Sequence, residues 1–331
     1  MPNRFGPALT CAALLAATGA MAQTAPAAAP AQATAVAPLT VQGAAPPKTV
    51  EKRTEAFVQA YAAPSAKLGQ FARWHDPVCV QVLGLIPEQA ALVAARTEEV
   101  AKAVGLKVGR PGCTANIEIA FADQPQALLD KVAAQRDSIL GFHYAAETKA
   151  LKTVTRPVQA WYKTATRGSG GPNAGMAFAN LTNSAGEAVP NGGLPGQTTE
   201  EETTDIPDNG TPTGCGDSHF SSCLQSVFKN VLVVVDNGRV KGQDLGLLSD
   251  YLAMVALSQT RSLDGCAALP SVIDLFAPAC PGRAAPDGLT PADAAYLTAL
   301  YAADPEAKKI AQQSDVAGRM ARILNGAKQA R

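Results

Sequence analysis

Residues 78–121 decide the fold, with the pieces VCVQVLGL (78–85), PEQAALVAARTEEVAKAVG (87–105) and NIEIAF (116–121). The first and last pieces are apolar and β-rich, which favours strands. The middle piece has the composition of a helix and runs from a proline to a glycine, as helices often do. A strand–helix–strand of this length favours a parallel pair joined by a right-handed crossover. The segment QPQALLDKVAAQ (124–135) then predicts a second helix.

Two cysteines support this topology. A parallel pair brings the starts of both strands to the same edge of the sheet. Cys79 lies at the start of the first predicted strand and Cys113 just before the second. A disulfide between them is therefore geometrically reasonable, and the pairing and the topology support each other.

The flanking residues extend this lobe to 49–166. TVEKRTEAFVQAYAA (49–63) has apolar residues at helical spacing and predicts an amphipathic helix that stops near Pro64. Strand-like runs at 139–145 and 158–164 are expected to extend the sheet, which would make it mixed.

The C-terminal part is predicted to be a helix-rich lobe over 215–325. Residues 167–214 are rich in Gly, Pro, Ser, Asn and Thr and are interpreted as a disordered linker, with a substrate-covering flap as the alternative. VLVVVD (231–236) predicts a buried strand followed by a turn at Asn237-Gly238. Helices are expected at 245–259, at 290–304 with Thr290 as its cap, and at 307–324, with a short apolar segment at 269–276. The predicted fold class is α+β.

The N-terminus has the three parts of a secretory signal. Arg4 is followed by an apolar run and by the small-x-small site Ala20-Met21-Ala22, so cleavage is expected after Ala22. Lipidation of Cys11 is the alternative. The signal would cover 1–22, and 23–48 is interpreted as a disordered Ala/Pro-rich spacer. No later stretch reaches 18 uninterrupted apolar residues. The mature chain is therefore expected to be periplasmic or secreted, with no membrane span.

Removing the signal leaves an even number of cysteines. Six cysteines allow 15 pairings, and their grouping favours neighbours in order. The predicted pairs are Cys79–Cys113, Cys215–Cys223 and Cys266–Cys280. No C-x-x-C motif exists and the chain has 3 histidines, so disulfides are favoured over a metal site, and no cofactor is expected.

Composition limits the partners. The net charge is zero, with 28 basic and 28 acidic residues, and no basic patch stands out. Nucleic acid is therefore not expected as a partner. The expected partner is a periplasmic protein or a small ligand.

One resemblance concerns residues 231–301. The segment Pro270-Ser271-Val272-Ile273, and Asp293 followed by Leu300-Tyr301, resemble the C-terminal half of uncharacterised secreted bacterial proteins related to zincin-type metallopeptidases. The active helix of that family carries H-E-x-x-H, which supplies two zinc-binding imidazoles and a general base. The resemblance covers about a fifth of the chain and implies a zincin-like frame for the C-terminal lobe.

The family's catalytic motif is missing here. Aligning the helix ends puts Ser249, Asp250 and Ala253 where His, Glu and His would stand. A lone aspartate cannot hold a catalytic zinc ion. The resemblance therefore implies a pseudoenzyme, in which Asp250 caps a helix or forms a salt bridge.

Other polar motifs are weaker. The sequence GDSH (216–219) contains a triplet seen around nucleophilic serines, but no strand-to-helix turn or later Asp/His pair accompanies it. WHD (74–76) fits a loop hydrogen bond or a ligand-binding patch. His143 is expected to be half-buried. Trp161 and Tyr162 alternate across a predicted strand, so one of them should face solvent.

Three hypotheses follow. The first is a non-catalytic periplasmic protein that binds or scaffolds other components. The second is a hydrolase with an atypical site between the lobes, for which Asp250, His219 and Asp236 are the candidates. The third is a small-molecule binding module in the cleft between the lobes.

Overall fold

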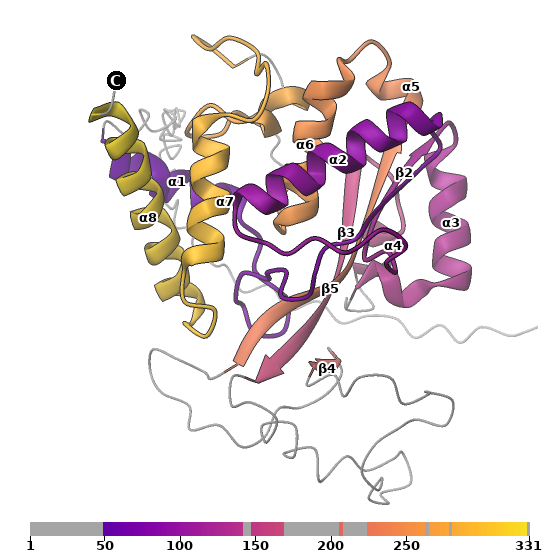
Figure 1. Ribbon diagram of the computed structural model, residues 1–331, viewed down its shortest axis with the longest axis horizontal. Coiled ribbons are helices and arrows are strands. Elements are labelled where there is room, and N and C mark those ends of the chain that lie inside the picture. Colours follow the sequence, from indigo (N-terminus) through magenta and orange to yellow (C-terminus); the bar gives the residue numbers. More distant parts are fainter. Residues whose placement is uncertain are drawn as a thin grey trace, which may run out of the picture. The chain divides into compact units, whose positions relative to one another are not determined.

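The computed structural model describes residues 49–141, 147–168, 205–207, 224–261, 265–277 and 280–329. The helices (α, or η for 3₁₀) and strands follow in this order: α1 (Val50–Tyr61), β1 (Val80–Leu83), α2 (Pro87–Ala103), β2 (Ile117–Ala122), α3 (Pro125–Gln135), η1 (Asp137–Leu140), α4 (Thr148–Leu151), β3 (Val158–Gly168), β4 (Asp205–Pro207), β5 (Leu224–Asp236), α5 (Asn237–Val240), α6 (Leu245–Leu257), η4 (Val272–Phe276), α7 (Pro291–Ala302) and α8 (Lys309–Gln329). Figure 1 shows their arrangement.

The described strands form one mixed sheet in the order β1-β2-β5-β3-β4. β1, β2 and β5 are parallel, and β3 is antiparallel to both β5 and β4. The predicted mixed α and β composition and the parallel β1–β2 pair joined through α2 are confirmed. The predicted disulfides Cys79–Cys113 and Cys266–Cys280 are also formed. The third predicted pair, Cys215–Cys223, lies outside the described residues.

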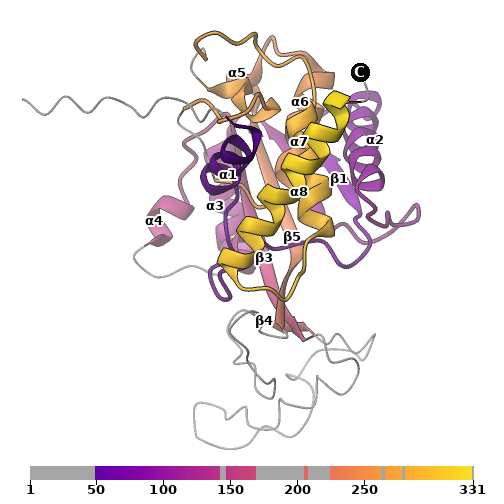
Figure 2. The ribbon, with the colours of Figure 1, turned by 90° about the vertical axis from the view of Figure 1, so that its left-hand side faces the viewer.

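Helices cover both faces of the sheet. Figure 2 shows α3 on one side of the strands and α2 and α6 on the other. Within β5, the side chains of residues 231, 233 and 235 join the larger core, to which α1, α6 and α7 also contribute. Those of residues 232 and 234 join a smaller core with Leu129 of α3. The continuous apolar run VLVVV therefore reflects a strand that is buried on both faces.

The position of β5 corrects the predicted division into lobes 49–166 and 215–325. β5 lies between β2 and β3 in the sheet, so both segments share one sheet and one main core. β5 also begins at Leu224, seven residues before the predicted start, and its early part pairs with the end of β3. The predicted linker 167–214 is interrupted by β4, which pairs with Ala165–Arg167.

Two local predictions also need correction. Ile139 and Leu140 belong to η1 and not to a strand, and 142–146 lie outside the described residues. Asn237 and Gly238 begin the short helix α5, because the Asp236 carboxylate accepts hydrogen bonds from the backbone of Gly238 and Arg239.

The predicted signal 1–22 and spacer 23–48 lie outside the described residues and stay predictions. Among the helices of the described part, none is both long and apolar enough to cross a membrane.

Candidate functional site

Asp250 of α6 forms an ion pair in which its carboxylate is nearly buried and the Arg96 side chain is 34% exposed. Its Oδ1 accepts a hydrogen bond from Arg96 Nε of α2 at 2.5 Å, and its Oδ2 accepts one from the Leu289 backbone N–H at 2.9 Å. The side chain of Asp250 is 10% exposed. Hydrogen bonds to Asp250 and Glu99 raise the pKa of Arg96. Both carboxylate oxygens thus hold α2, α6 and the segment before α7 together.

The residues at the aligned positions 249 and 253 lie in the core of the protein. Ser249 and Ala253 are fully buried, and the Ser249 hydroxyl donates to the carbonyl of Leu245 at 2.6 Å. The residues of α6 that line a groove beside β3 are instead Tyr251 and Val255, which are also four apart. Neither side chain is a zinc ligand.

Asp236, the second hydrolase candidate, does not join Asp250 at one site. Asp236 caps α5 at the carboxyl end of β5 and lines a depression with Gln126, Asp130 and Arg239. Asp250 lines a different depression, which shares no residue with the first. His219, like Ser218 and His143, lies outside the described residues.

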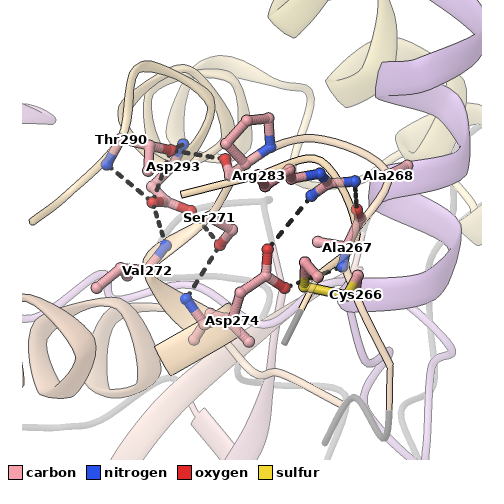
Figure 3. A network of polar contacts seen from close by, with 12 residues as sticks. Cys266, Ala267, Ala268, Ser271, Val272, Asp274, Arg283, Thr290 and Asp293 are labelled. Atoms are coloured by element: carbon pink, nitrogen blue, oxygen red, sulfur yellow. Dashed lines mark hydrogen bonds and ion pairs between the residues drawn. A yellow bond between two sulfur atoms is a disulfide. The ribbon is translucent and has the colours of Figure 1, made fainter. Parts of the chain in front are cut away.

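Figure 3 shows that the segments carrying the family resemblance form a buried structural network. The Ser271 hydroxyl donates to Asp293 Oδ1 at 2.5 Å, and the backbone N–H groups of Val272 and Thr290 donate to Asp293 Oδ2 at 2.8 and 2.9 Å. Burial raises the pKa of Asp293, and these hydrogen bonds offset part of the rise. The network joins the start of η4 to the capping box of α7.

Figure 3 also shows a second set of polar contacts, beside the disulfide Cys266–Cys280. Asp274 accepts hydrogen bonds from the Ala267 backbone N–H at 2.9 Å and from Arg283 at 3.3 Å. Arg283 also donates to the Ala267 carbonyl at 2.5 Å. Asp274 of η4 and Arg283 therefore hold the backbone at Ala267 in place.

A groove of about 90 Å³ lies between the edge of β3 and the elements α6 and η4. Its walls combine aromatic, aliphatic and basic side chains. The lining residues are Arg156, Pro157, Val158, Gln159, Ala160, Tyr162, Tyr251, Val255, Thr260, Arg261, Ile273, Phe276 and Ala277. Two arginines and no carboxylate belong to this described lining, so the groove favours an anionic or neutral ligand.

Ring packing and a hydrogen bond position the aromatic wall of the groove. Tyr251 and Phe276 pack edge to face, with ring centroids 5.0 Å apart. The Tyr162 hydroxyl donates to the Val255 carbonyl at 2.9 Å. Burial raises the pKa of Tyr251 to about 12 and that of Tyr162 still further, so both phenols are neutral at physiological pH.

Among the described residues, no strand pairs with the outer side of β3 over Val158–Ala160, so the rim of the groove there is a sheet edge. The Asp236 backbone N–H donates to the Pro157 carbonyl at 2.9 Å, which identifies residues 157 and 236 as a hydrogen-bonded pair. Because these pairs alternate along an antiparallel ladder, Val158 and Ala160 direct their N–H and C=O groups away from β5. Gly141 lies against the carbonyl of Tyr162, so the open stretch is short.

The WHD segment forms a separate polar cluster. Asp76 accepts hydrogen bonds from Lys229 at 3.2 Å and from Arg167 at 3.3 Å, and Arg167 also contacts the His75 ring. Desolvation by burial raises the pKa of Asp76, but the two cations outweigh it and the net shift is downward. Trp74 is buried, and its indole N–H donates to the Ala256 carbonyl at 3.0 Å. These contacts fasten the 70–78 segment to β3 and β5.

The groove was not predicted from the sequence. One of Trp161 and Tyr162 was expected to face solvent, but Trp161 is 2% exposed and Tyr162 packs against the main core. Trp161 is buried and Tyr162 is half-buried, because the sheet has helices on both faces. The only sequence signal for the groove was the alternation of Trp161 and Tyr162, which identified β3 but not its position at the edge.

Comparison with protein-family models, with curated proteins and with solved structures finds no match for this chain.

Proposed function

We propose that this chain is an exported, non-catalytic binding protein that holds an extended segment of another protein along the edge of β3. The groove beside that edge carries the proposal. Val158 and Ala160 offer backbone donors and acceptors on its rim, and an added strand would pair with them. Side chains of the added segment that point to the α6 face would enter the aromatic-lined groove. Its volume of about 90 Å³ suits one small apolar side chain.

The charge of the groove specifies the partner further. Arg261 lines it and no described carboxylate does, so an acidic side chain next to the apolar one would be attracted by the Arg261 guanidinium group. The proposed partner is therefore an extended, acidic peptide segment of another exported protein. Two disulfides fit a periplasmic or extracellular location for this pairing.

The contacts of Asp250 support the non-catalytic part of the proposal. A catalytic carboxylate in a hydrolase must be accessible to the substrate and must have a second catalytic polar group within reach. Asp250 instead has one oxygen on Arg96 and the other on the Leu289 backbone. The degenerate metallopeptidase-like frame remains part of this proposal and rests on the sequence resemblance around residues 270 and 293.

A peptide panel tests the binding. Fluorescence anisotropy would compare extended heptapeptides with a central valine flanked by glutamates, by glutamines or by lysines. We expect the glutamate peptide to bind most tightly and its affinity to fall as salt rises. If none of the peptides binds, or if the lysine peptide binds best, the proposal is overturned.

A matched pair of proline substitutions locates the site. Ala160→Pro removes an outward N–H of β3 without removing a ladder hydrogen bond, and should weaken the glutamate peptide about tenfold or more. Val80→Pro does the same to β1 at the opposite edge and should leave the affinity unchanged. Equal loss in both variants would contradict a site on β3. Metal analysis of the same sample covers the alternative, because one zinc ion per chain would contradict the non-catalytic assignment.

A further inference from the structure

A depression lies at the carboxyl ends of two neighbouring parallel strands. β2 and β5 are paired up to their last residues, Ala122 and Asp236. After β2 the chain continues into α3 on one face of the sheet, and after β5 it continues through α5 into α6 on the other face (Figure 2). Parallel neighbours whose connections leave to opposite faces open a crevice at their carboxyl ends, and open α/β sheets bind ligands in such a crevice.

The depression occupies this crevice. Its volume of about 530 Å³ lies in the range of small-molecule sites. It is lined by the start of α3, by Val154, by Asp236 at the end of β5 and by Arg239 of α5. None of its lining residues lines the groove beside β3, so the depression is a second site, beyond the proposed function.

Hydrogen bonds hold the walls of the depression in place. The Gln126 side chain of α3 accepts the Val154 backbone N–H at 2.8 Å and donates to the Lys152 carbonyl at 2.9 Å. Arg239 Nη1 of α5 donates to the Thr155 carbonyl at 2.9 Å. The segment before β3 therefore connects the start of α3 with α5.

Three charged side chains of the lining keep unused hydrogen-bonding atoms. Asp130 Oδ1 accepts from the Gln126 side chain at 2.8 Å. Asp236 Oδ1 accepts from the backbone N–H groups of Gly238 and Arg239 at 3.0 and 3.2 Å. The Oδ2 atoms of both carboxylates, and Nε and Nη2 of Arg239, have no partner among the described residues. The depression therefore offers two acceptors and one donor edge to a ligand.

A carboxylate accepts hydrogen bonds and a guanidinium group donates them, so a ligand that satisfies both must donate and accept. Two carboxylates against one guanidinium group disfavour an anion. Within the described part of the chain, no group of three or more His, Cys, Asp or Glu side chains could hold a metal ion. We propose that this depression binds a neutral carbohydrate, whose hydroxyl groups donate to Asp130 and Asp236 and accept from Arg239. The C–H groups of the sugar ring would pack against Pro125 and Val154.

NMR titration of the full mature chain, labelled with nitrogen-15, tests the site. The neutral probes are glucose, galactose, mannose and N-acetylglucosamine, and the charged probes are glycine, phosphate and methylammonium. We expect at least one sugar to shift the backbone amide signals of residues 124–130 and 236–239 in a saturable way, and to bind there more tightly than every charged probe. If no sugar produces saturable shifts at these residues, or if a charged probe binds there more tightly, the proposal is overturned.

Three variants locate the binding to these side chains. Asp130→Ala removes one acceptor and Arg239→Met removes the donor edge, and each should weaken the sugar about tenfold or more. Asp287→Ala is the matched control, because Asp287 is an exposed carboxylate that lines the different depression beside Asp250, and it should leave the affinity unchanged. All three side chains are exposed, and the amide spectrum of each variant shows directly whether its fold is intact. An equal affinity in the wild-type protein and all three variants would overturn the proposal.

Discussion

Replacing Asp293 with alanine should be among the most destabilising single changes in this protein. The carboxylate is fully buried and accepts hydrogen bonds from the Ser271 hydroxyl and from the backbone of Val272 and Thr290. Alanine would leave the buried N–H of Val272 without an acceptor, at about 1–3 kcal/mol. It would also break the capping box of α7, at about 1 kcal/mol. With the cavity left by the carboxylate, the expected loss is about 4 kcal/mol.

Asparagine at this position should cost much less. Its amide oxygen can take the place of Oδ2 and accept the N–H groups of Val272 and Thr290, while its NH₂ donates to the Ser271 oxygen. Because every partner keeps a bond, we expect Asp293→Asn to lose about 1 kcal/mol. Urea unfolding of the oxidised protein at neutral pH gives both values from the shift in midpoint at constant slope. An equal loss of unfolding free energy in the two variants would refute the argument that the hydrogen bonds of Asp293 stabilise the fold.

The pH dependence checks the same carboxylate by a different route. Burial raises the pKa of Asp293 above its ordinary 3.8, so the folded chain holds this proton more tightly than the unfolded chain. The stability that Asp293 contributes is therefore complete below about pH 4 and is lost as the pH rises through its folded pKa. Asp293→Asn should remove this part of the pH dependence. An unchanged profile in the variant would contradict the raised pKa.

Three further changes test the other polar contacts. Arg96→Met leaves the carboxylate of Asp250 without its cation and should cost about 2 kcal/mol in urea unfolding, and combining it with Asp250→Asn should recover part of that loss. Replacing both Cys266 and Cys280 with serine opens a loop whose ends have a sequence separation of 14 and should cost about 3 kcal/mol, measured with the other disulfides intact. Asp76 has a lowered pKa, so its contribution is present above about pH 4 and is lost as the pH falls through its folded pKa. Asp76→Asn should make the acid limb of the stability profile shallower, and an unchanged limb would contradict the pairing with its two cations.

Local sequence signals predicted most individual elements of the fold. The proline at position 87 and the glycine at 105 bounded α2 to within two residues, and Thr290 with Asp293 located the start of α7. These signals work because the caps and turns that they describe involve residues within a few positions of each other. The disulfides Cys79–Cys113 and Cys266–Cys280 were predictable for a related reason, since each joins neighbours in the cysteine order.

The order of strands could not be predicted in the same way. The run VLVVV indicates only that β5 is buried on both faces, and it does not say which strands lie beside it. Its neighbours β2 and β3 are contributed by the segment before residue 169, which the glycine-rich stretch seemed to separate from it. Only the tertiary structure places β5 between them, and the sequence alone therefore predicted two lobes.

The candidate groove depends on this same strand order. With β5 inside the sheet, β3 becomes the outer partner of β5 over Val158–Ala160, and no strand of the described part pairs with its outward backbone groups. α6 follows β5 directly after α5 and therefore returns along the face beside that edge, which brings Tyr251 and Val255 to the rim of β3. The insertion of β5 between β2 and β3 thus accounts for both walls of the groove. Reactive side chains in the sequence do not indicate this groove, because its rim consists of backbone groups and its walls of ordinary aromatic and aliphatic residues.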